Sequence, residues 1–332
     1  MNERAATATQ ALSGEAALKL LFPDQAALTL AERLRLAGGS RIRGTMAGKR
    51  RSAALGGSQE FADYRPYVPG DDTRRIDWSV YGRTGRAYIR QYWDEQELHA
   101  HLYIDTSRSM DFEGGAPCSK LLYALRLAAL VGYAALAGDD RVTLRTFDDQ
   151  SMGVASPILR GRAAFPKLYT HLAHVSTTAK GAVGMDDKSG EGALAPASNL
   201  ARPFRSAGAL PRRAGVTWLF TDALFEEGIE ETLMSLASAG QQLVLVQLLS
   251  PEELRPSLSG ELKLVDSELG SGKEVAISDG LLKEYRASVA AYQELLRRRC
   301  AELGAAYAFV DTGLTMSEAL QLLLAIPGGL RR

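Results

Sequence analysis

Hydrophobic and polar positions along the chain follow two alternating patterns. Short apolar runs of strand length, such as residues 102–104 and 215–221, end abruptly at polar residues. Between these runs lie longer segments with helical spacing, of which residues 119–137 are almost wholly apolar. The pattern predicts helices over residues 25–37, 119–137, 163–173, 226–239, 280–303 and 316–324. It predicts strands over residues 87–92, 97–104, 141–147, 215–221, 241–249, 261–266, 273–277 and 307–310.

This alternation of elements predicts the fold class. Buried strands that alternate with helices form a parallel sheet joined by right-handed crossovers, with helices on both faces. We therefore expect an α/β protein with a doubly wound, mostly parallel sheet flanked by helices, and with a small β-rich N-terminal subdomain. The expected divisions are a helical segment at 1–40, the basic β-rich subdomain at 41–96, the α/β domain at 97–326 and a tail at 327–332. Within them, we expect an exposed arm or loop at 41–57 and a mobile surface insertion at 176–197.

Composition is that of an ordinary globular protein. Of 332 residues, 46% are hydrophobic, and the 39 basic and 39 acidic residues cancel. Cys118 and Cys300 are too few and too far apart for a disulfide framework, which suits a reducing compartment. No secretory signal is evident at the N-terminus, and the longest uncharged window, 232–251, is interrupted at Gly240. We expect a cytoplasmic protein without membrane insertion.

Charge is distributed unevenly along the chain. Between Arg41 and Arg90 there are eleven basic and five acidic residues. Basic residues neutralise phosphates and aromatic residues stack on bases, so nucleic-acid binding through 41–90 is one alternative function. The balanced charge of the whole chain does not favour it.

A loop of oxygen ligands follows the strand that ends at Ile104. Asp105, Ser107 and Ser109 occupy alternate positions there, and a second strand ends at Asp222. Groups at the carboxyl ends of parallel strands line the crevice in which ligands bind. Because these oxygens are hard donors, the sequence predicts a site for Mg²⁺ or Mn²⁺ rather than zinc.

The residues ahead of this loop carry a long and specific motif. It runs from 61 to 78, continues from 82 to 92, and contains Pro69-Gly70-Asp71-Asp72-Thr73-Arg74-Arg75-Ile76-Asp77-Trp78. Together with Asp-Thr-Ser-Arg-Ser-Met at 105–110, it resembles, nearly word for word, the signature of the domain-of-unknown-function 58 (DUF58) family. Members of that family join the signature to a von Willebrand factor A-like domain. The close resemblance covers residues 49–110, and weaker similarity runs through the rest.

The resemblance implies how a metal ion would be held. In the metal-ion-dependent adhesion site (MIDAS) of von Willebrand A domains, hydroxyls at the positions of Ser107 and Ser109 bind the ion directly. Carboxylates at the positions of Asp105 and Asp222 act mostly through water. The resemblance therefore implies a Mg²⁺ or Mn²⁺ cofactor at these four residues.

The same resemblance asks for a hydroxyl from a middle loop. The family usually carries Thr-Asp-Leu there, whereas this sequence departs from the pattern with Ser198-Asn199-Leu200. Ser198 is the expected ligand because it stands just before a possible helix. Thr177 and Thr178 stay open as competitors.

A protein partner is also implied. Members of the family are commonly encoded beside MoxR-type AAA+ ATPases, so the chain is expected to act as an adaptor of such an ATPase, or of other von Willebrand A-domain proteins, in chaperone-like assembly. A metal with an open coordination position can take an acidic group from the partner. The residues expected to form the recognition surface are Arg65, Asp71, Asp72, Arg74, Arg75, Asp77 and Trp78. A purely structural role for this set, with the charges as an ion network and Trp78 in a core, stays open.

Enzymatic alternatives lack essential groups. A haloacid-dehalogenase-like phosphohydrolase would use Asp105 as nucleophile but needs an acid two residues on, where Ser107 stands. No serine lies in a nucleophile elbow, and no glycine-rich phosphate loop with its lysine is present. The four histidines, His99, His101, His171 and His174, have no further ligands that would suggest zinc. The sequence therefore favours a binding protein over an enzyme.

Overall fold

The computed structural model describes residues 14–37, 47–96, 98–182, 198–257, 260–265 and 272–331. The chain divides into two compact units. Met1–Gly39 and His99–Arg332 form the first, which we call the α/β unit, and Ser40–Leu98 form the second, which we call the signature unit.

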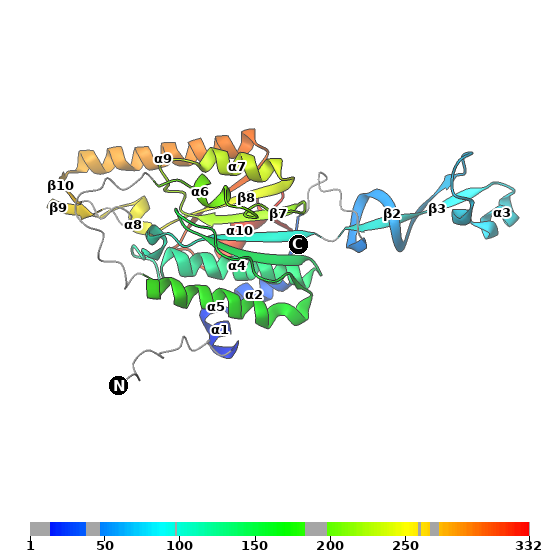
Figure 1. Cartoon of the computed structure of the whole chain (residues 1–332), viewed down its shortest axis with the longest axis horizontal. Coiled ribbons are helices and arrows are strands. Elements are labelled where there is room, and N and C mark those ends of the chain that lie inside the picture. The colour runs from blue at the N-terminus through cyan, green and yellow to red at the C-terminus, as the bar shows by residue number, and fades with distance from the viewer. Residues whose placement is uncertain are drawn as a thin grey trace. The chain divides into compact units, whose positions relative to one another are not determined.

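A six-stranded sheet forms the centre of the α/β unit (Figure 1). Its strands lie in the order β11-β8-β7-β4-β5-β6, and all are parallel except β6, which pairs antiparallel with β5. Their bounds are β4 His99–Asp105, β5 Arg141–Phe147, β6 Leu159–Arg160, β7 Gly215–Thr221, β8 Gln241–Leu249 and β11 Ala306–Asp311. The expectation of a mixed α/β fold with a mostly parallel sheet is confirmed.

The strand order reverses between β4 and β7. β4 is the first strand of this sheet along the chain; the chain continues to β5 and β6 on one side and later to β7, β8 and β11 on the other. In open α/β sheets, ligands bind at the carboxyl ends of the strands where the strand order reverses in this way. Asp105 ends β4, and Asp222 directly follows β7.

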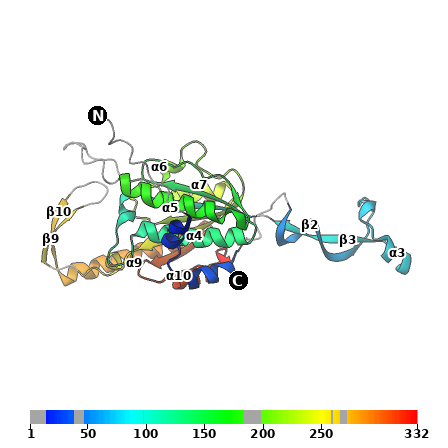
Figure 2. The ribbon, with the colours of Figure 1, turned by 90° about the horizontal axis from the view of Figure 1, so that it is seen from below.

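Helices cover both faces of the sheet (Figures 1 and 2). α4 (Lys120–Ala137) lies against β4 and β5, and outside it lie α1, α2, α5 and α10. The opposite face carries α7 next to β8 and α9 next to β11. The bounds of these helices are α1 Gly14–Leu21, α2 Gln25–Glu32, α5 Phe165–Ala182, α7 Ile229–Ser238, α9 Asp279–Glu302 and α10 Met316–Leu324. Two short helices, α6 (Ala201–Phe204) and α8 (Pro251–Leu254), and the antiparallel pair β9 (Gly260–Val265) and β10 (Gly272–Ile277) complete the unit.

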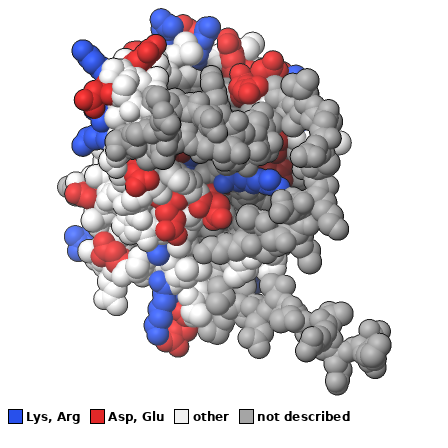
Figure 3. Space-filling model, turned by 90° about the vertical axis from the view of Figure 1, so that its left-hand side faces the viewer, with Lys and Arg blue, Asp and Glu red and all other residues white. Residues whose placement is uncertain are grey.

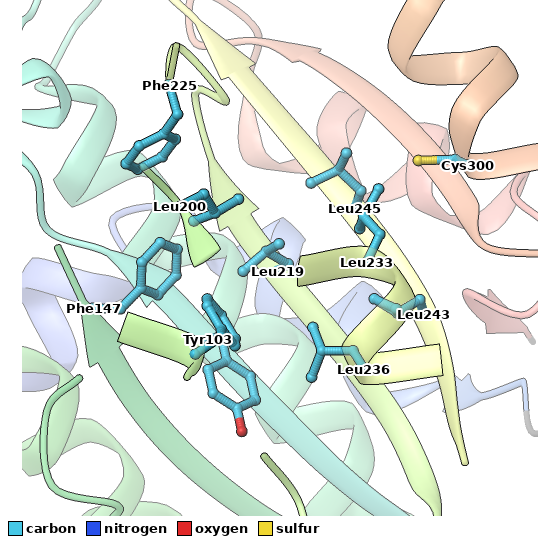
Figure 4. Close-up of a cluster of buried hydrophobic side chains, with 11 residues drawn as sticks. Tyr103, Phe147, Leu200, Leu219, Phe225, Leu233, Leu236, Leu243, Leu245 and Cys300 are labelled. Carbon is cyan, nitrogen blue, oxygen red and sulfur yellow. The ribbon is translucent and has the colours of Figure 1, made fainter. Parts of the chain in front are cut away.

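The core follows from the near-continuous apolar sequence of the strands. Every residue of β4 and β7 is buried, as expected of parallel strands covered on both faces. On the face opposite α4, an apolar cluster joins the sheet to α6, α7 and α9 (Figure 4). Its members are Tyr103, Phe147, Leu200, Phe204, Leu219, Phe225, Leu233, Leu236, Leu243, Leu245 and Cys300.

One helix among the described residues, α4, could cross a membrane by length and composition alone. It is 83% buried within the protein, and Ser119 caps its N-terminus by accepting a hydrogen bond from the backbone of Leu122. Burial on this scale fits the expected role of residues 119–137 as a helix packed against the sheet.

Several element boundaries differ from the sequence predictions because distant segments decide them. The helix expected over 25–37 ends at Glu32, since Arg35 and Leu36 form β1, which pairs with β12 (Leu330–Arg331). α5 does not end at residue 173 but continues to Ala182; the hydroxyls of Thr177 and Thr178 donate to the carbonyl of His174, so its polar end is satisfied within the helix. Residues 183–197 of the expected insertion lie outside the described residues.

The signature unit is built on two antiparallel strands. β2 (Ala47–Pro66) pairs with β3 (Tyr88–Gln96), with several shifts of register. The expectation of a loop at 41–57 is therefore wrong from Ala47 onward, because pairing with β3 extends the chain there; residues 41–46 lie outside the described residues. Between the strands lie a 3₁₀ turn, Thr73–Arg75, and α3, Trp78–Thr84.

Val216 in β7 provides a test of the core. Strand β7 lies between β4 and β8, and the side chain of Val216 is fully buried. Val216→Ala should therefore lower the free energy of unfolding by about 2 kcal/mol, through lost burial and the cavity left behind. Val154 is 96% exposed, and Val154→Ala should change it by less than about 0.5 kcal/mol. Urea unfolding followed by circular dichroism measures both; equal effects would contradict the placement of β7.

Candidate functional site

Asp105 is a fully buried carboxylate at the end of β4. Its Oδ1 accepts a hydrogen bond from the backbone N–H of Ser107 at 2.9 Å, and its Oδ2 accepts one from the hydroxyl of Thr221 at 2.5 Å. Burial, and then the negative charge of Asp222, raise the pKa of Asp105 to about 7. Among the described residues, no lysine, arginine or histidine forms an ion pair with it. A buried carboxylate with two hydrogen bonds and no cation is an unusual arrangement.

Two serine hydroxyls lie beside this carboxylate in the chain. The Oγ atoms of Ser107 and Ser109 are 3.1 Å apart, at the start of a 3₁₀ turn, Arg108–Asp111. Ser107 stands at the N-cap, yet its hydroxyl makes no capping hydrogen bond. The hydroxyl is turned instead toward Ser109, which leaves the two oxygens side by side.

The spacing of this pair fits a magnesium ion. Mg²⁺ binds oxygens at 2.0–2.1 Å in octahedral geometry, so neighbouring ligands lie about 3 Å apart. In the part of the chain that the structure describes, no three His, Cys, Asp or Glu side chains form a group that could hold a metal. A site here would therefore depend on the hydroxyls of Ser107 and Ser109, with Asp105 beside them. The donor set is consistent with Mg²⁺ or Mn²⁺ and not with zinc.

Asp222 is paired with a buried lysine that the sequence analysis did not consider. The Nζ atom of Lys120, in the first turn of α4, lies 2.8 Å from Asp222 Oδ2 and 2.5 Å from Glu253 Oε1. The other oxygen of Asp222 accepts the backbone N–H of Leu224. Burial lowers the pKa of Lys120, but the charges of Asp222 and Glu253 outweigh it, so the pKa is raised and the ammonium stays charged.

The signals for this ion triad in the sequence are weak. Lys120 is one of two charged residues in the apolar stretch 119–137, which could have marked it as a buried charge. Glu253 gives no such signal, because it forms a capping box with Ser250 at the start of α8. Only the fold brings the loop after β8 against the first turn of α4.

The loop that carries Asp222 is held firmly. Ala223 has a φ of 58°, a left-handed conformation that is uncommon for residues other than glycine. Its carbonyl accepts a hydrogen bond from the hydroxyl of Tyr292, and Gln247 donates to the carbonyl of Asp222. These contacts compensate for the strained backbone and fix the orientation of the carboxylate.

The third expected hydroxyl ligand is bound to a different loop. The Oγ of Ser198 accepts the backbone N–H of Glu226 at 3.2 Å, and its carbonyl accepts that of Glu227. These contacts place Ser198 against the loop that follows Asp222, and no hydrogen bond joins it to Ser107 or Ser109. The competitors Thr177 and Thr178 lie on α5, where both hydroxyls donate to the backbone of that helix.

Part of the signature set builds the signature unit itself. Arg65 binds Asp71 through two hydrogen bonds of 2.6 and 2.5 Å, and this ion pair lowers the pKa of Asp71 to about 2. Asp77 caps α3 and also accepts hydrogen bonds from Tyr64 and Arg90. These contacts favour a structural role for Arg65, Asp71 and Asp77.

The remaining signature residues face solvent. Asp72 caps the 3₁₀ turn that contains Arg74 and Arg75, and all three are exposed. Trp78 is 64% exposed and packs edge-on against Tyr81, so the alternative that places Trp78 in a core is wrong. Two arginines beside an exposed aromatic pair remain suited to recognition.

The enzymatic and zinc alternatives gain no support from the geometry. Both oxygens of Asp105 are buried and hydrogen-bonded, which is unfavourable for a nucleophile that must reach a phosphate. His99 and His101 are buried and stacked on each other, while His171 and His174 lie on α5. On the side of the α/β unit where α8 lies, basic and acidic side chains are interspersed over the described surface (Figure 3).

Comparisons with known proteins identify a family. The family model described as "Protein of unknown function DUF58" matches residues 63–295. Uncharacterized proteins of Mycobacterium bovis and Mycobacterium tuberculosis are 28% identical over 266 residues, which cover 80% of this chain and 78% of theirs. The matched region contains most of the signature, the Asp105 loop and Asp222.

Solved structures give weaker matches. The conserved hypothetical protein BatB of Bacteroides thetaiotaomicron is 15% identical, with 62% of this chain and 98% of that chain covered and a TM-score of 0.28. An aerotolerance-related membrane protein of Bacteroides fragilis is 19% identical, with 68% and 97% covered and a TM-score of 0.35. At these TM-scores the matches carry no argument about fold, function or location.

Lys120 allows a test of the ion triad. Lys120→Met should lower the free energy of unfolding by about 3–5 kcal/mol, because it leaves the buried Asp222 and the partly buried Glu253 without their cation. The double variant Lys120→Met/Asp222→Asn should recover part of this loss. Lys19→Met is the control, because the Lys19–Glu15 pair is 77% exposed on both sides and should contribute less than about 1 kcal/mol. Chemical denaturation measures all three, and similar effects at positions 19 and 120 would contradict the buried pair.

Proposed function

The chain belongs to the DUF58 family, and from that premise we propose that its α/β unit is a von Willebrand A-like, metal-dependent protein-binding module. The observation that carries the proposal is the group at the end of β4. A buried carboxylate without a cation partner among the described residues stands next to two hydroxyls spaced as ligands of Mg²⁺ are. The group also lies where the strand order reverses, the position at which open α/β sheets bind ligands.

The four residues at the candidate metal site would have different roles in binding the ion. Ser107 and Ser109 supply direct oxygen ligands, and Asp105 contributes negative charge from the buried side. Asp222 contributes less charge than a free carboxylate would, because Lys120 already neutralises part of it. Since the direct ligands are neutral hydroxyls, a bound ion keeps much of its positive charge and can take a carboxylate from another molecule.

Magnitudes favour a switchable contact over a passive surface pair. A hydrogen bond or ligand contact to a charged group is worth about 1.5–3 kcal/mol, whereas an exposed ion pair is worth about 0–1 kcal/mol. A single contact of this kind is too weak to hold a partner alone. The exposed arginines 74 and 75 and Trp78 of the signature unit would supply further contacts.

The partner we propose is a MoxR-type AAA+ ATPase, or another von Willebrand A-domain protein, that offers an acidic group. The chain would act as its adaptor in chaperone-like assembly, in the cytoplasm, and without chemistry of its own. This step follows from the association of the family with such ATPases and from the positive charge that a metal bound by neutral hydroxyls is expected to keep.

Metal binding can be measured directly with Mn²⁺ as the probe. The double variant Ser107→Ala/Ser109→Ala should weaken Mn²⁺ binding at least tenfold, because it removes both direct ligands. Thr106→Val is the control: this residue directly precedes Ser107 in sequence, but its hydroxyl donates to the carbonyl of Phe147. Electron paramagnetic resonance counts free Mn²⁺, and equal affinities for the wild type and the double variant would disprove the site.

Partner capture is a separate test. The purified MoxR-type ATPase of the same organism should be retained by the wild-type chain in Mg²⁺ and released by a chelator. Asp105→Ala should abolish this retention and leave the fold intact, because the lost charge has no cation partner among the described residues. Retention that is unaffected by both the chelator and the substitution would exclude a role for the metal in partner binding.

A further inference from the structure

A cavity of about 290 Å³ lies on the face of the sheet opposite α4. Its floor is made by β4 and β5, whose odd-numbered residues point to this face while Leu102 lies against α4. Its wall is the segment 207–212, which leads into β7. This cavity is separate from the group at the end of β4, and the function proposed above makes no use of it.

The lining is positively charged. Arg145 of β5 and Arg212 of the wall both line the cavity, and none of its lining residues in the described part of the chain is an aspartate or glutamate. Neither arginine side chain takes part in an ion pair or a hydrogen bond with the residues that the structure describes. Two guanidinium groups that share a concave site without an acid form a site for an anion.

A buried imidazole adds a third polar group. His101 is 8% exposed, and its Nε2 atom is buried without a hydrogen bond. Its Nδ1 lies 2.8 Å from the hydroxyl of Thr143, which also lies 3.3 Å from Nε2 of His99. A hydroxyl carries one hydrogen, so Thr143 can donate to only one of the two imidazoles. When it donates to Nδ1 of His101, the proton of that ring is on Nε2, and His101 becomes a hydrogen-bond donor.

The same environment keeps this imidazole neutral while no anion is bound. Burial is the main cause that lowers the pKa of His101 to about 3; the stacked His99 and the charge of Arg145 add to it, and the nearby backbone carbonyl of Arg213 opposes it. A neutral imidazole still donates one hydrogen bond. An anion therefore needs no protonation of His101 to be recognised by it.

The wall that carries Arg212 is tied to the floor. The hydroxyl of Tyr103 donates to the carbonyl of Ala209 at 2.6 Å. In Figure 4 this hydroxyl points away from the other labelled side chains of the apolar cluster. The contact holds the segment 207–212 over β4, so that the backbone of Arg212 is fixed beside the cavity.

We propose that this cavity binds the phosphate group of a small molecule, held by Arg145, Arg212 and Nε2–H of His101. Two guanidinium groups match the charge of about −1.5 to −2 on a phosphate monoester, and their paired N–H groups fit its oxygens. Leu210 and Ala155 supply apolar lining for the remainder of the ligand. The volume is at the small end of the 300–1,000 Å³ range of ligand sites, so the ligand is small.

Inorganic phosphate is the probe for the first experiment. The side-chain ¹⁵N signals of His101, in the full chain, should shift saturably as phosphate is added. Arg145→Gln and Arg212→Gln should each weaken binding at least tenfold. Arg213→Gln removes the same charge one residue away, from a side chain that does not line the cavity, and should change the affinity less than twofold.

Three results would overturn the proposal. They are the absence of a saturable shift with phosphate, equal weakening by Arg212→Gln and Arg213→Gln, and binding of acetate as tight as that of phosphate. If Arg145→Gln does not fold, Arg145→Lys keeps the charge but loses the planar pair of donors, and binding should still weaken. A variant with unchanged Mn²⁺ binding and lost phosphate binding separates this site from the metal site.

Discussion

The burial of two carboxylates at neighbouring strand ends is the constraint on which the α/β unit depends. Asp105 and Asp222 approach each other because β4 and β7 are adjacent in the sheet, and the negative charge of Asp222 raises the pKa of Asp105. A buried charge costs several kcal/mol unless it is paired and hydrogen-bonded. Lys120, Thr221 and the backbone of Ser107 meet this requirement in part. The first turn of α4 and the loops after β4, β7 and β8 are thereby tied to one polar centre.

The arrangement around this centre is asymmetric, and the asymmetry suits ion binding. Asp222 has a permanent cation in Lys120, which α4 supplies from inside the protein. Asp105 has hydrogen bonds but no cation among the described residues. One carboxylate thus stabilises the fold, while the other keeps its capacity to attract a cation that the pair of hydroxyls can hold. The signature unit shows a similar division, with Arg65, Asp71 and Asp77 in its internal contacts and Trp78 exposed.

Strand β4 carries two distinct polar features because successive side chains point to opposite faces. Leu102 and Ile104 bury the face against α4 and give the strand its apolar character. His101 and Tyr103 point to the other face, which α7 and α9 cover only farther along the sheet, at β8 and β11. On this face, β4, β5 and the segment 207–212 enclose the cationic cavity. The end of the strand, at Asp105, forms the candidate metal site.

The sequence by itself determined the alternation of strands and helices, the apolar helix at 119–137 and the position of Asp105 and Asp222 at strand ends, because continuous apolar runs and their polar endings are local patterns. It also indicated the family, since the signature is contiguous. Only the tertiary structure decided that Glu32 ends a helix, that residues from Ala47 form a strand, and that Lys120 and Glu253 meet at Asp222. Each of these outcomes depends on pairing between segments far apart in the chain, such as β1 with β12 and α4 with the loop after β8. The local sequence cannot predict such pairings, because they contribute free energy only when the whole sheet has formed.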